Sequence, residues 1–421
     1  GNTSHAAVIA RGLGLPCVSG ANGIKVDPRK KSLVTADGRV FVEGDLITLD
    51  GTSGEVLEGK VPLVSVGLRD SFYTLMKWSD EFRDIGIRVN ADTPQDAGVA
   101  NNFGVEGIGL CRTEHMFFAE ERLTVLREAI FANSSLDRAT ALERILPMQR
   151  KDFSELFKIM APLPVCLRLF DPPLHEFLPN SRAGIQQLAE AMNLTLKEVQ
   201  ERIEGLSEFN PMLGMRGVRL GITVPEIYEM QARAIFEAVI DVAISCKQKV
   251  VPEIMIPLVS AKREVELVKS SIDSVAKQVS EESGRDIDYK LGVMVETPRA
   301  ALRAGEISKD VSFFSFGTND MTQMTYGLSR DDAGRFMSNY VSQDVFEEDP
   351  FHILDREGVG ELLSLACERG RMTNKNLILS VCGEHGGDPE SIEFCRALGM
   401  DYVSCSPYRV PVAKLAAAQL A

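Results

Sequence analysis

Eight short apolar runs with the composition of β-strands recur along most of this 421-residue chain, and amphipathic helical stretches separate them. Strands that alternate with helices build a parallel sheet, because each helix returns the chain to the starting edge before the next strand. Eight such units over about 335 residues predict an α/β fold, a (β/α)8 barrel of the TIM type with insertions, over residues 87–421. The expected strands are Ile87–Asn90, Ile108–Arg112, Val165–Leu169, Ile254–Pro257, Leu291–Glu296, Phe313–Gly317, Ile378–Val381 and Tyr402–Cys405.

The segment before the barrel has a different pattern. Residues 1–62 are rich in Gly and Val and predict a small β-rich module, with short strands at Val40–Val42, Asp45–Gly51 and Gly54–Leu57. Residues 63–86 form a bridge to the barrel and predict a packed linker helix. The helical spacing in this bridge is carried by Phe72, Leu75, Met76, Ser79 and Phe82.

The largest insertion in the barrel lies between the third and fourth strands, and its pattern is helical. Thr195 and Glu198 stand three residues apart ahead of an apolar periodic run, which is the spacing of a capping box. We therefore expect a helix to begin at this point of the insertion.

Composition excludes several classes of function. The formal net charge of -14 argues against general nucleic-acid binding, although a local group of arginines can still bind an anion. No apolar run approaches the roughly 20 residues of a membrane span, and no signal peptide is visible. The eight cysteines contain no CxxC pair, which favours a reduced, cytoplasmic setting.

A histidine near the start of the chain is a candidate for chemistry. Thr3 is a good N-cap, Ser4–Arg11 predicts a short helix, and Gly12 followed by Gly14 ends it. His5 would then lie in the first turn, where free N–H groups and the helix dipole favour a phosphate. On the local pattern alone, a surface histidine at a helix start is the favoured interpretation of His5.

Polar side chains gather at the expected carboxyl ends of the barrel strands, where such barrels place their reactive groups. Two guanidiniums, two carboxylates, an amide and a thiol would converge on one mouth, which is unusual for a random set of strand ends. These residues are Arg112, Arg168, Glu296, Asn319, Asp320 and Cys382.

The two carboxylates follow adjacent strands. Glu296 closes one apolar run and Asp320 follows the next, so both are expected at the same edge of the barrel. Mg²⁺ takes few protein oxygens and completes its octahedron with water and substrate, so this pair predicts a magnesium site. For either acid alone, a helix N-cap or a salt bridge is the alternative.

The arginines and the thiol each leave two interpretations open. Arg112 and Arg168 follow apolar strand residues. They hold a phosphate or carboxylate, pair internally with Glu114 or Asp171, or do both, with the acids positioning the arginines. Arg216 and Arg330, in a loop or at a helix start, are weaker candidates. Cys382 is either an inert buried thiol or a proton donor to a carbanion-like carbon at the mouth.

Taken together, these segments resemble the phosphoenolpyruvate-utilising enzyme family over essentially the whole chain, and within it the pyruvate phosphate dikinases. Cys111–His115 and Glu384–Gly387 depart from the pattern of the sugar-phosphotransferase Enzyme I, and Phe170–His175 departs from phosphoenolpyruvate synthase, the two alternatives. The matching segments are Thr3–Ala7, Gly107–Phe118, Arg168–Pro179, Asn210–Arg216, Val293–Ala300, Ser315–Gln323 and Val381–Pro389.

The resemblance implies a role for each candidate residue. His5 would carry the phosphoryl group, in a partial phosphohistidine (swivelling) domain over residues 1–62. Arg112 and Arg168 would hold phosphoenolpyruvate, and Cys382 would protonate carbon 3 of the enolate. Glu296 and Asp320 would ligate Mg²⁺ and contact the substrate, which Gly317, Thr318 and Asn319 would line.

The resemblance also implies partners. The family's full dikinase converts ATP, phosphate and pyruvate to AMP, diphosphate and phosphoenolpyruvate, and its ATP-binding domain precedes the histidine domain. Nothing in this chain resembles that ATP-binding domain. We therefore expect the chain to be a C-terminal portion of the full enzyme, which uses ATP and phosphate only through the missing domain. A homodimer through the barrel is implied as well. The non-enzyme alternative is an inert fragment that serves only as a dimerisation scaffold.

Overall fold

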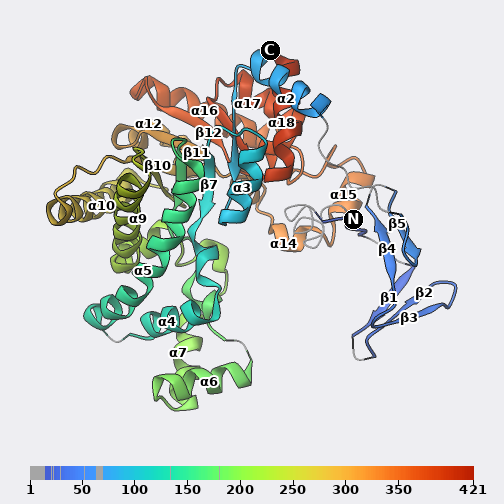
Figure 1. Cartoon of the computed structure of the whole chain (residues 1–421), viewed down its shortest axis with the longest axis horizontal. Coiled ribbons are helices and arrows are strands. Elements are labelled where there is room, and N and C mark those ends of the chain that lie inside the picture. The colour runs from blue at the N-terminus through green and yellow to red at the C-terminus, as the bar shows by residue number, and fades with distance from the viewer. Residues whose placement is uncertain are drawn as a thin grey trace. The chain divides into compact units, whose positions relative to one another are not determined.

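The computed structural model describes residues 15–19, 21, 23–28, 30–51, 53–62, 70–132, 134–179 and 181–421. The predicted helix around His5 lies outside these residues. The described residues divide into two compact units, whose elements are labelled in Figure 1. One unit extends to Trp78 and includes Asp331–Glu347, and the other comprises Ser79–Arg330 and Glu348–Ala421. The predicted three-part division at residues 62 and 86 stays a prediction.

The smaller unit contains short antiparallel strands. β1, β2 and β3 form one sheet in that order, and β4 pairs with β5. The expected strands correspond to β3, β4 and β5, whereas β1 and β2 were not expected, although each holds as many apolar residues as β4 or β5. None of the described residues from 15 to 62 is buried, so these strands enclose little core. The bounds are β1 (Ile24–Asp27), β2 (Ser32–Thr35), β3 (Val40–Val42), β4 (Ile47–Asp50) and β5 (Glu55–Glu58).

Helix α2 (Asp70–Phe82) confirms the helical spacing predicted for the bridge, but not all of its apolar positions pack. Met76 and Ser79 are buried, whereas Leu75 and Phe82 are exposed. The last turn belongs to the larger unit, where Lys414, which is 1% exposed, donates to Asp80 Oδ2 at 2.8 Å.

The larger unit is the predicted closed barrel of parallel strands. Neighbouring strands follow the order β10-β11-β12-β13-β6-β7-β8-β9, so the first and last strands in the sequence pair and close the sheet. Each observed strand lies within two residues of its predicted bounds. The strands are β6 (Gly86–Asn90), β7 (Ile108–Arg112), β8 (Val165–Arg168), β9 (Pro252–Ile256), β10 (Lys290–Val295), β11 (Phe313–Phe316), β12 (Ile378–Val381) and β13 (Tyr402–Cys405).

Helices surround the barrel, as Figure 1 shows for α5, α9 and α10 on one side and for α16 and α18 on another. The insertion after β8 is helical, and α7 begins with the predicted capping box of Thr195 and Glu198.

The helices between β6 and β9 are α3 (Pro94–Asn102), α4 (Glu120–Phe131), α5 (Ser135–Met160), α6 (Arg182–Met192), α7 (Leu196–Leu206), α8 (Val218–Thr223) and α9 (Pro225–Cys246). Those after β9 include α10 (Lys262–Ser283), α11 (Pro298–Leu302), α12 (Ala304–Ile307), α13 (Thr318–Tyr326), α14 (Arg330–Ala333), α15 (Met337–Ser342), α16 (Gly358–Thr373), α17 (Pro389–Ala397) and α18 (Val410–Leu420). The 3-10 turns are η1 (Thr113–Phe117), η2 (Leu174–Phe177), η3 (Pro211–Leu213), η4 (Ser308–Asp310), η5 (Glu384–Gly387) and η6 (Pro407–Arg409).

Side chains fill the interior of the barrel. One buried cluster takes residues from five strands and from the position after β12, and consists of Leu110, Cys166, Met255, Met294, Phe313 and Cys382. Gly292 is required beside this cluster, because a Cβ there would lie 2.3 Å from the Phe313 ring. Nearby, Arg88 pairs with Glu253 at 2.6 Å and stacks over the Tyr402 ring. A packed interior leaves the mouth at the strand ends as the place where a ligand can bind.

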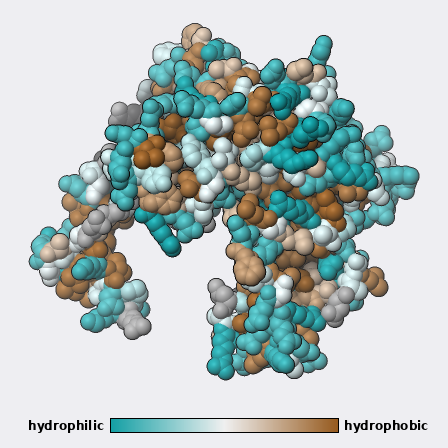
Figure 2. Space-filling model, turned by 180° about the vertical axis from the view of Figure 1, so that it is seen from behind, coloured by the Kyte–Doolittle hydropathy of each residue, from teal (hydrophilic) through white to brown (hydrophobic). Residues whose placement is uncertain are grey.

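The face of the molecule seen in Figure 2 mixes hydrophilic and hydrophobic residues, as expected for a chain with 25% charged and 44% hydrophobic residues. Among the helices of the described residues, we find none with the length and apolar content that a membrane crossing requires.

Candidate active site

The ends of neighbouring strands bring the predicted polar residues together. Arg112 and Arg168 are directly paired across β7 and β8, and Val295 and Phe316 are paired across β10 and β11. Because Glu296 follows Val295 and Gly317 follows Phe316, the sheet register sets the carboxylate beside the Gly317–Asp320 segment. The convergence expected from the strand ends is therefore confirmed for these elements.

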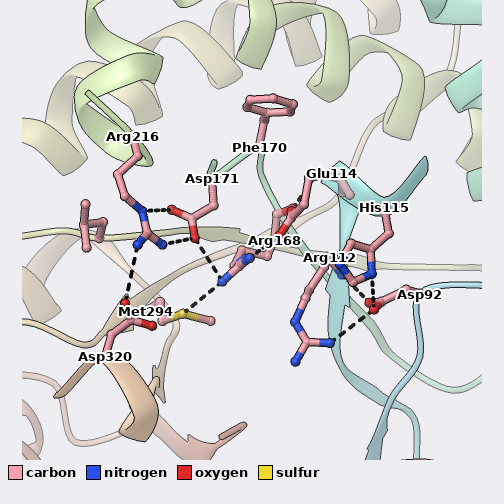
Figure 3. Close-up of polar contacts among 12 residues, drawn as sticks. Asp92, Arg112, Glu114, His115, Arg168, Phe170, Asp171, Arg216, Met294 and Asp320 are labelled. Carbon is pink, nitrogen blue, oxygen red and sulfur yellow. Dashed lines mark hydrogen bonds and ion pairs between the residues drawn. The ribbon is translucent and has the colours of Figure 1, made fainter. Parts of the chain in front are cut away.

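Arg168 is held by two carboxylates. Its side chain is 10% exposed, and it forms ion pairs with Glu114 and, at 3.2 Å, with Asp171 (Figure 3). Burial alone would lower the pKa of Arg168, but the charges of Glu114 and Asp171 raise it well above its ordinary value. Internal pairing with Glu114 and Asp171, one of the two alternatives, thus occurs for Arg168.

Arg112 pairs with neither Glu114 nor Asp171, the two acids that the sequence suggests as partners. Its guanidinium donates to Asp92 Oδ2 at 3.1 Å, and its backbone N–H donates to Asp92 Oδ1 at 2.6 Å. The Arg112 side chain remains 31% exposed, so part of the guanidinium is open to a ligand. Burial would raise the pKa of Asp92, but Arg112 and His115 outweigh it and lower the pKa to about 2.

Arg216 belongs to the site, although the sequence ranked it among the weaker candidates. It lies between η3 and α8, where the insertion returns to the barrel mouth. The guanidinium pairs with Asp171 and lies 3.5 Å from Asp320 Oδ1 (Figure 3). Its side chain is 8% exposed, so Arg216 is a buried member of the cluster. Arg330, the other weak candidate, lies 3.9 Å from Glu384.

Glu296 and Asp320 form a buried acidic pair. Glu296 is fully buried and accepts the Leu258 backbone N–H at 2.6 Å. Burial raises the pKa of Glu296 well above its ordinary value, and the charge of Asp320 raises it further. Burial likewise raises the pKa of Asp320, against the opposing charge of Arg216. Such a pair is unfavourable as two anions unless a cation balances it.

Three oxygens of this pair and its neighbour accept no hydrogen bond from any described residue. They are Glu296 Oε2, Asn319 Oδ1 and Asp320 Oδ1, the last of which has only the 3.5 Å ion pair with Arg216. Buried oxygens normally accept hydrogen bonds, so a group of them without a donor at one edge of the barrel indicates a binding partner for these oxygens. Two carboxylates and an amide oxygen are ligands that Mg²⁺ accepts, so the residues present fit the predicted metal.

The Gly317–Asp320 segment packs closely on its neighbours. A Cβ at Gly317 would lie 2.6 Å from Glu296 Oε2, so only glycine fits there. Thr318 is fully buried, and its Oγ1 lies 2.7 Å from His385 Nδ1. His385 Nε2 lies 3.1 Å from the Pro350 carbonyl, which only accepts, so Nε2 carries the proton and Thr318 donates to Nδ1. Burial lowers the pKa of His385 to about 4, which keeps the ring neutral.

Cys382 lies at the end of β12 and is 2% exposed. Burial raises the pKa of its thiol to about 11, although a hydrogen bond with Ser315 acts in the opposite direction. The Sγ atom lies 3.7 Å from the Phe316 carbonyl. At neutral pH Cys382 is therefore a protonated thiol, which can donate a proton but is a poor nucleophile.

Sequence reasoning missed four residues around this site, namely Asn90, Asp92, His115 and His385. The signal for Asn90 and Asp92 was present, because Asn90 ends the first barrel strand and Asp92 follows it. His115 and His385 follow Arg112 and Cys382 by three residues each, but their partners are distant in the sequence. His5 lies outside the described residues.

The fold and the site define a (β/α)8 barrel whose mouth holds the part-exposed Arg112 guanidinium and the buried Glu296–Asp320 pair. Comparison with known protein families finds two domains that match this chain. The PEP-binding domain of PEP-utilising enzymes matches residues 68–421, and their mobile domain matches residues 1–54. The chain belongs to the PEP-utilising enzymes.

Three relatives are each named pyruvate, phosphate dikinase. The protein of Rhizobium meliloti (strain 1021) is 55% identical over 100% of this chain and 46% of its own length. Those of Clostridium symbiosum and Giardia intestinalis are 49% and 51% identical, over 100% and 99% of this chain and 48% and 47% of their lengths. The chain thus spans about half the length of the curated relatives that it matches.

Proposed function

We propose that this chain transfers a phosphoryl group between phosphoenolpyruvate and its own His5, which is the phosphoenolpyruvate/pyruvate half of the pyruvate, phosphate dikinase reaction. The observation that carries the proposal is the cluster of Arg112, Arg168 and Cys382 beside the Glu296–Asp320 pair. Its support comes from the match to the PEP-binding domain and from the dikinase names of the relatives.

Glu296 and Asp320 would hold Mg²⁺, with Asn319 as a further oxygen donor. When bound, the metal stabilises negative charge on the enolate and on the phosphoryl group. A divalent cation would offset the repulsion between these two buried carboxylates.

The arginines bind and orient the anion. Arg112, which is part exposed, and Arg168 hold the phosphoryl group and the carboxylate of phosphoenolpyruvate, while Gly317, Thr318 and Asn319 line the substrate. Glu114 and Asp171 fix the direction of the Arg168 guanidinium, so this side chain needs little reorganisation when the substrate arrives.

The proton step uses Cys382. Transfer breaks the phosphorus–oxygen bond of phosphoenolpyruvate, forms a phosphorus–nitrogen bond at His5 and leaves the enolate of pyruvate. The Cys382 thiol gives its proton to carbon 3 of that enolate, and the resulting thiolate regains a proton from water. The raised thiol pKa suits this role, because the proton is present at neutral pH.

The rest of the dikinase reaction needs a site for ATP and phosphate. We infer that this chain meets these reactants through a preceding ATP-binding domain of the longer protein. We further infer a homodimer through the barrel and a cytoplasmic location, supported by the resemblance and by cysteines that are free throughout the described residues. Light scattering on the purified chain tests the oligomeric state.

Calorimetric titration tests substrate binding. The chain should bind phosphoenolpyruvate or pyruvate with Mg²⁺ and lose that binding in excess chelator. The double variant Glu296→Ala with Asp320→Ala should not bind under either condition. Equal binding with and without Mg²⁺ would contradict the proposed metal site.

Mass spectrometry tests the transfer. Incubation with phosphoenolpyruvate and Mg²⁺ should produce an acid-labile phosphoryl adduct on His5, and the His5→Gln variant should lack it. A chain that binds phosphoenolpyruvate but forms no adduct would be an inert scaffold, contrary to the proposal. Adduct formation in the His5→Gln variant would place the carrier elsewhere.

A further inference from the structure

Asp92 links two cationic side chains at the barrel mouth. Its Oδ2 accepts from the Arg112 guanidinium at 3.1 Å and from His115 Nδ1 at 2.8 Å (Figure 3). Its Oδ1 is occupied by the Arg112 backbone N–H at 2.6 Å. The Asp92 side chain is 12% exposed, so water competes little for these oxygens. Arg112 and His115 therefore share one acceptor atom.

The His115 ring lies in η1 at the edge of the mouth. Its side chain is 47% exposed, and the Phe118 ring lies beside it at a centroid separation of 6.1 Å. Its Nδ1 contacts Asp92, and we find no hydrogen bond from Nε2 to any described residue. The ring thus exchanges protons freely with solvent while it contacts a group that positions Arg112.

The charged groups that face His115 come from three elements. Asp92 follows β6, Arg112 ends β7, and Glu114 precedes the histidine in η1. The hydrogen bond to Asp92 raises the pKa of His115, and Glu114 acts in the same direction, while burial and Arg112 oppose them. On balance the pKa of His115 lies above that of an ordinary histidine.

We propose that His115 is a proton-dependent positioning residue, which takes Asp92 Oδ2 when protonated and thereby releases the Arg112 guanidinium to the phosphoryl oxygens of the substrate. A charged donor binds a carboxylate more strongly than a neutral one, so protonation shifts Asp92 from Arg112 to His115. When His115 is neutral, Arg112 stays tied to Asp92. The inference rests on the proposed function, because it assigns the phosphoryl group to Arg112.

The pH dependence has a definite sign. Protonation is complete below the His115 pKa, so phosphoenolpyruvate should bind more tightly at low pH and more weakly as the pH rises through that value. His115→Asn is neutral at every pH and keeps an amide that can donate to Asp92. At about pH 6 it should bind about threefold more weakly than the unaltered chain, and at about pH 9 the two should converge.

Two measurements on the 421-residue chain test the proposal. The first is calorimetric titration with phosphoenolpyruvate and Mg²⁺ from about pH 6 to about pH 9. It compares the unaltered chain with His115→Asn and with His352→Asn, a control outside the Asp92 cluster. Because every variant receives the same ligand, the ionisation of phosphoenolpyruvate cancels in the ratio of affinities.

The second measurement is an NMR titration of the histidine ring protons, with His115→Asn to assign the His115 resonance. Its pKa should lie above that of an ordinary histidine, and Asp92→Asn should lower it. A merely structural His115 would titrate without any effect on binding.

The outcomes separate the inference from the proposed function. Tight binding with the same pH profile in the unaltered chain and in His115→Asn would overturn the inference and leave the proposed function standing. A His115 pKa that Asp92→Asn does not change would also overturn it. Absence of binding at every pH would overturn the proposed function, and the inference with it.

Discussion

The side-chain amide of Asn90 donates a hydrogen bond of 3.0 Å to the backbone carbonyl of Cys382. Its Oδ1 accepts from Ser404 Oγ at 2.6 Å, so one residue at the end of β6 joins β13 and β12. The thiol that we assign to proton transfer is thus positioned by the first strand of the barrel, almost three hundred residues away in the sequence.

We expect Asn90→Ala to slow the exchange of pyruvate methyl protons with solvent by about tenfold, because the Cys382 backbone loses a fixed contact and the thiol leaves its productive position. Affinity for phosphoenolpyruvate should change little, since the arginines are untouched. Proton NMR in deuterated solvent measures the exchange. Asn101→Ala, at an exposed position of α3, is the matched control. An unchanged exchange rate in Asn90→Ala would refute the positioning role.

Cys382 should react slowly with iodoacetamide at neutral pH. The exposed Cys246 should be labelled at least about a hundredfold faster, because Cys382 is buried and its thiol pKa is about 11. The Cys382 rate should rise with pH up to that pKa. Peptide mass spectrometry follows both sites, and Cys246→Ser shows that the slow rate belongs to Cys382. Equal rates at neutral pH would indicate a thiolate and would contradict a proton-donor role.

Mg²⁺ should stabilise the folded chain. At a free concentration a hundredfold above its dissociation constant, a ligand of the folded state adds about 2.7 kcal/mol to the free energy of unfolding. Glu296→Gln, which removes one of the two buried carboxylates, should lose most of this gain. Thermal unfolding of the larger unit with Mg²⁺ and with chelator measures both values. Glu264→Gln, at the start of α10, is a control, and an equal gain in Glu296→Gln would exclude Glu296 as a ligand.

His385 should make the fold sensitive to acid. Its pKa is lowered from 6.5 to about 4, so the unfolded chain binds the proton more readily than the folded chain between these values. Stability from this group is therefore complete above about pH 6.5 and is lost as the pH falls toward 4, by on the order of 3 kcal/mol.

Denaturant unfolding at several pH values measures this loss. His385→Gln should be less stable at neutral pH but should show a flatter pH dependence, because a glutamine does not take up the proton. His352→Gln should keep the original slope. An unchanged slope in His385→Gln would mean that other groups cause the acid sensitivity.

Local sequence patterns determined the barrel strands and much of the site. Apolar runs between helices are a local consequence of burial, so β7, β12 and β13 have the bounds that were predicted. Residues at strand ends share one edge of a parallel barrel, so the meeting of Arg112, Arg168 and the Glu296–Asp320 pair followed from the predicted fold. The capping box of α7 is also local, since its two residues are three apart.

The tertiary structure alone decided which groups are partners. Asp92 rather than Glu114 or Asp171 binds Arg112, and Arg216 returns to the mouth through a long helical insertion. His385 reaches Thr318 from the neighbouring strand, and Asn90 reaches Cys382 past the intervening strand β13. Local patterns report burial and hydrogen bonds over a few residues. Contacts between distant residues depend instead on strand register and on the path of each insertion, which exist only once the barrel has closed.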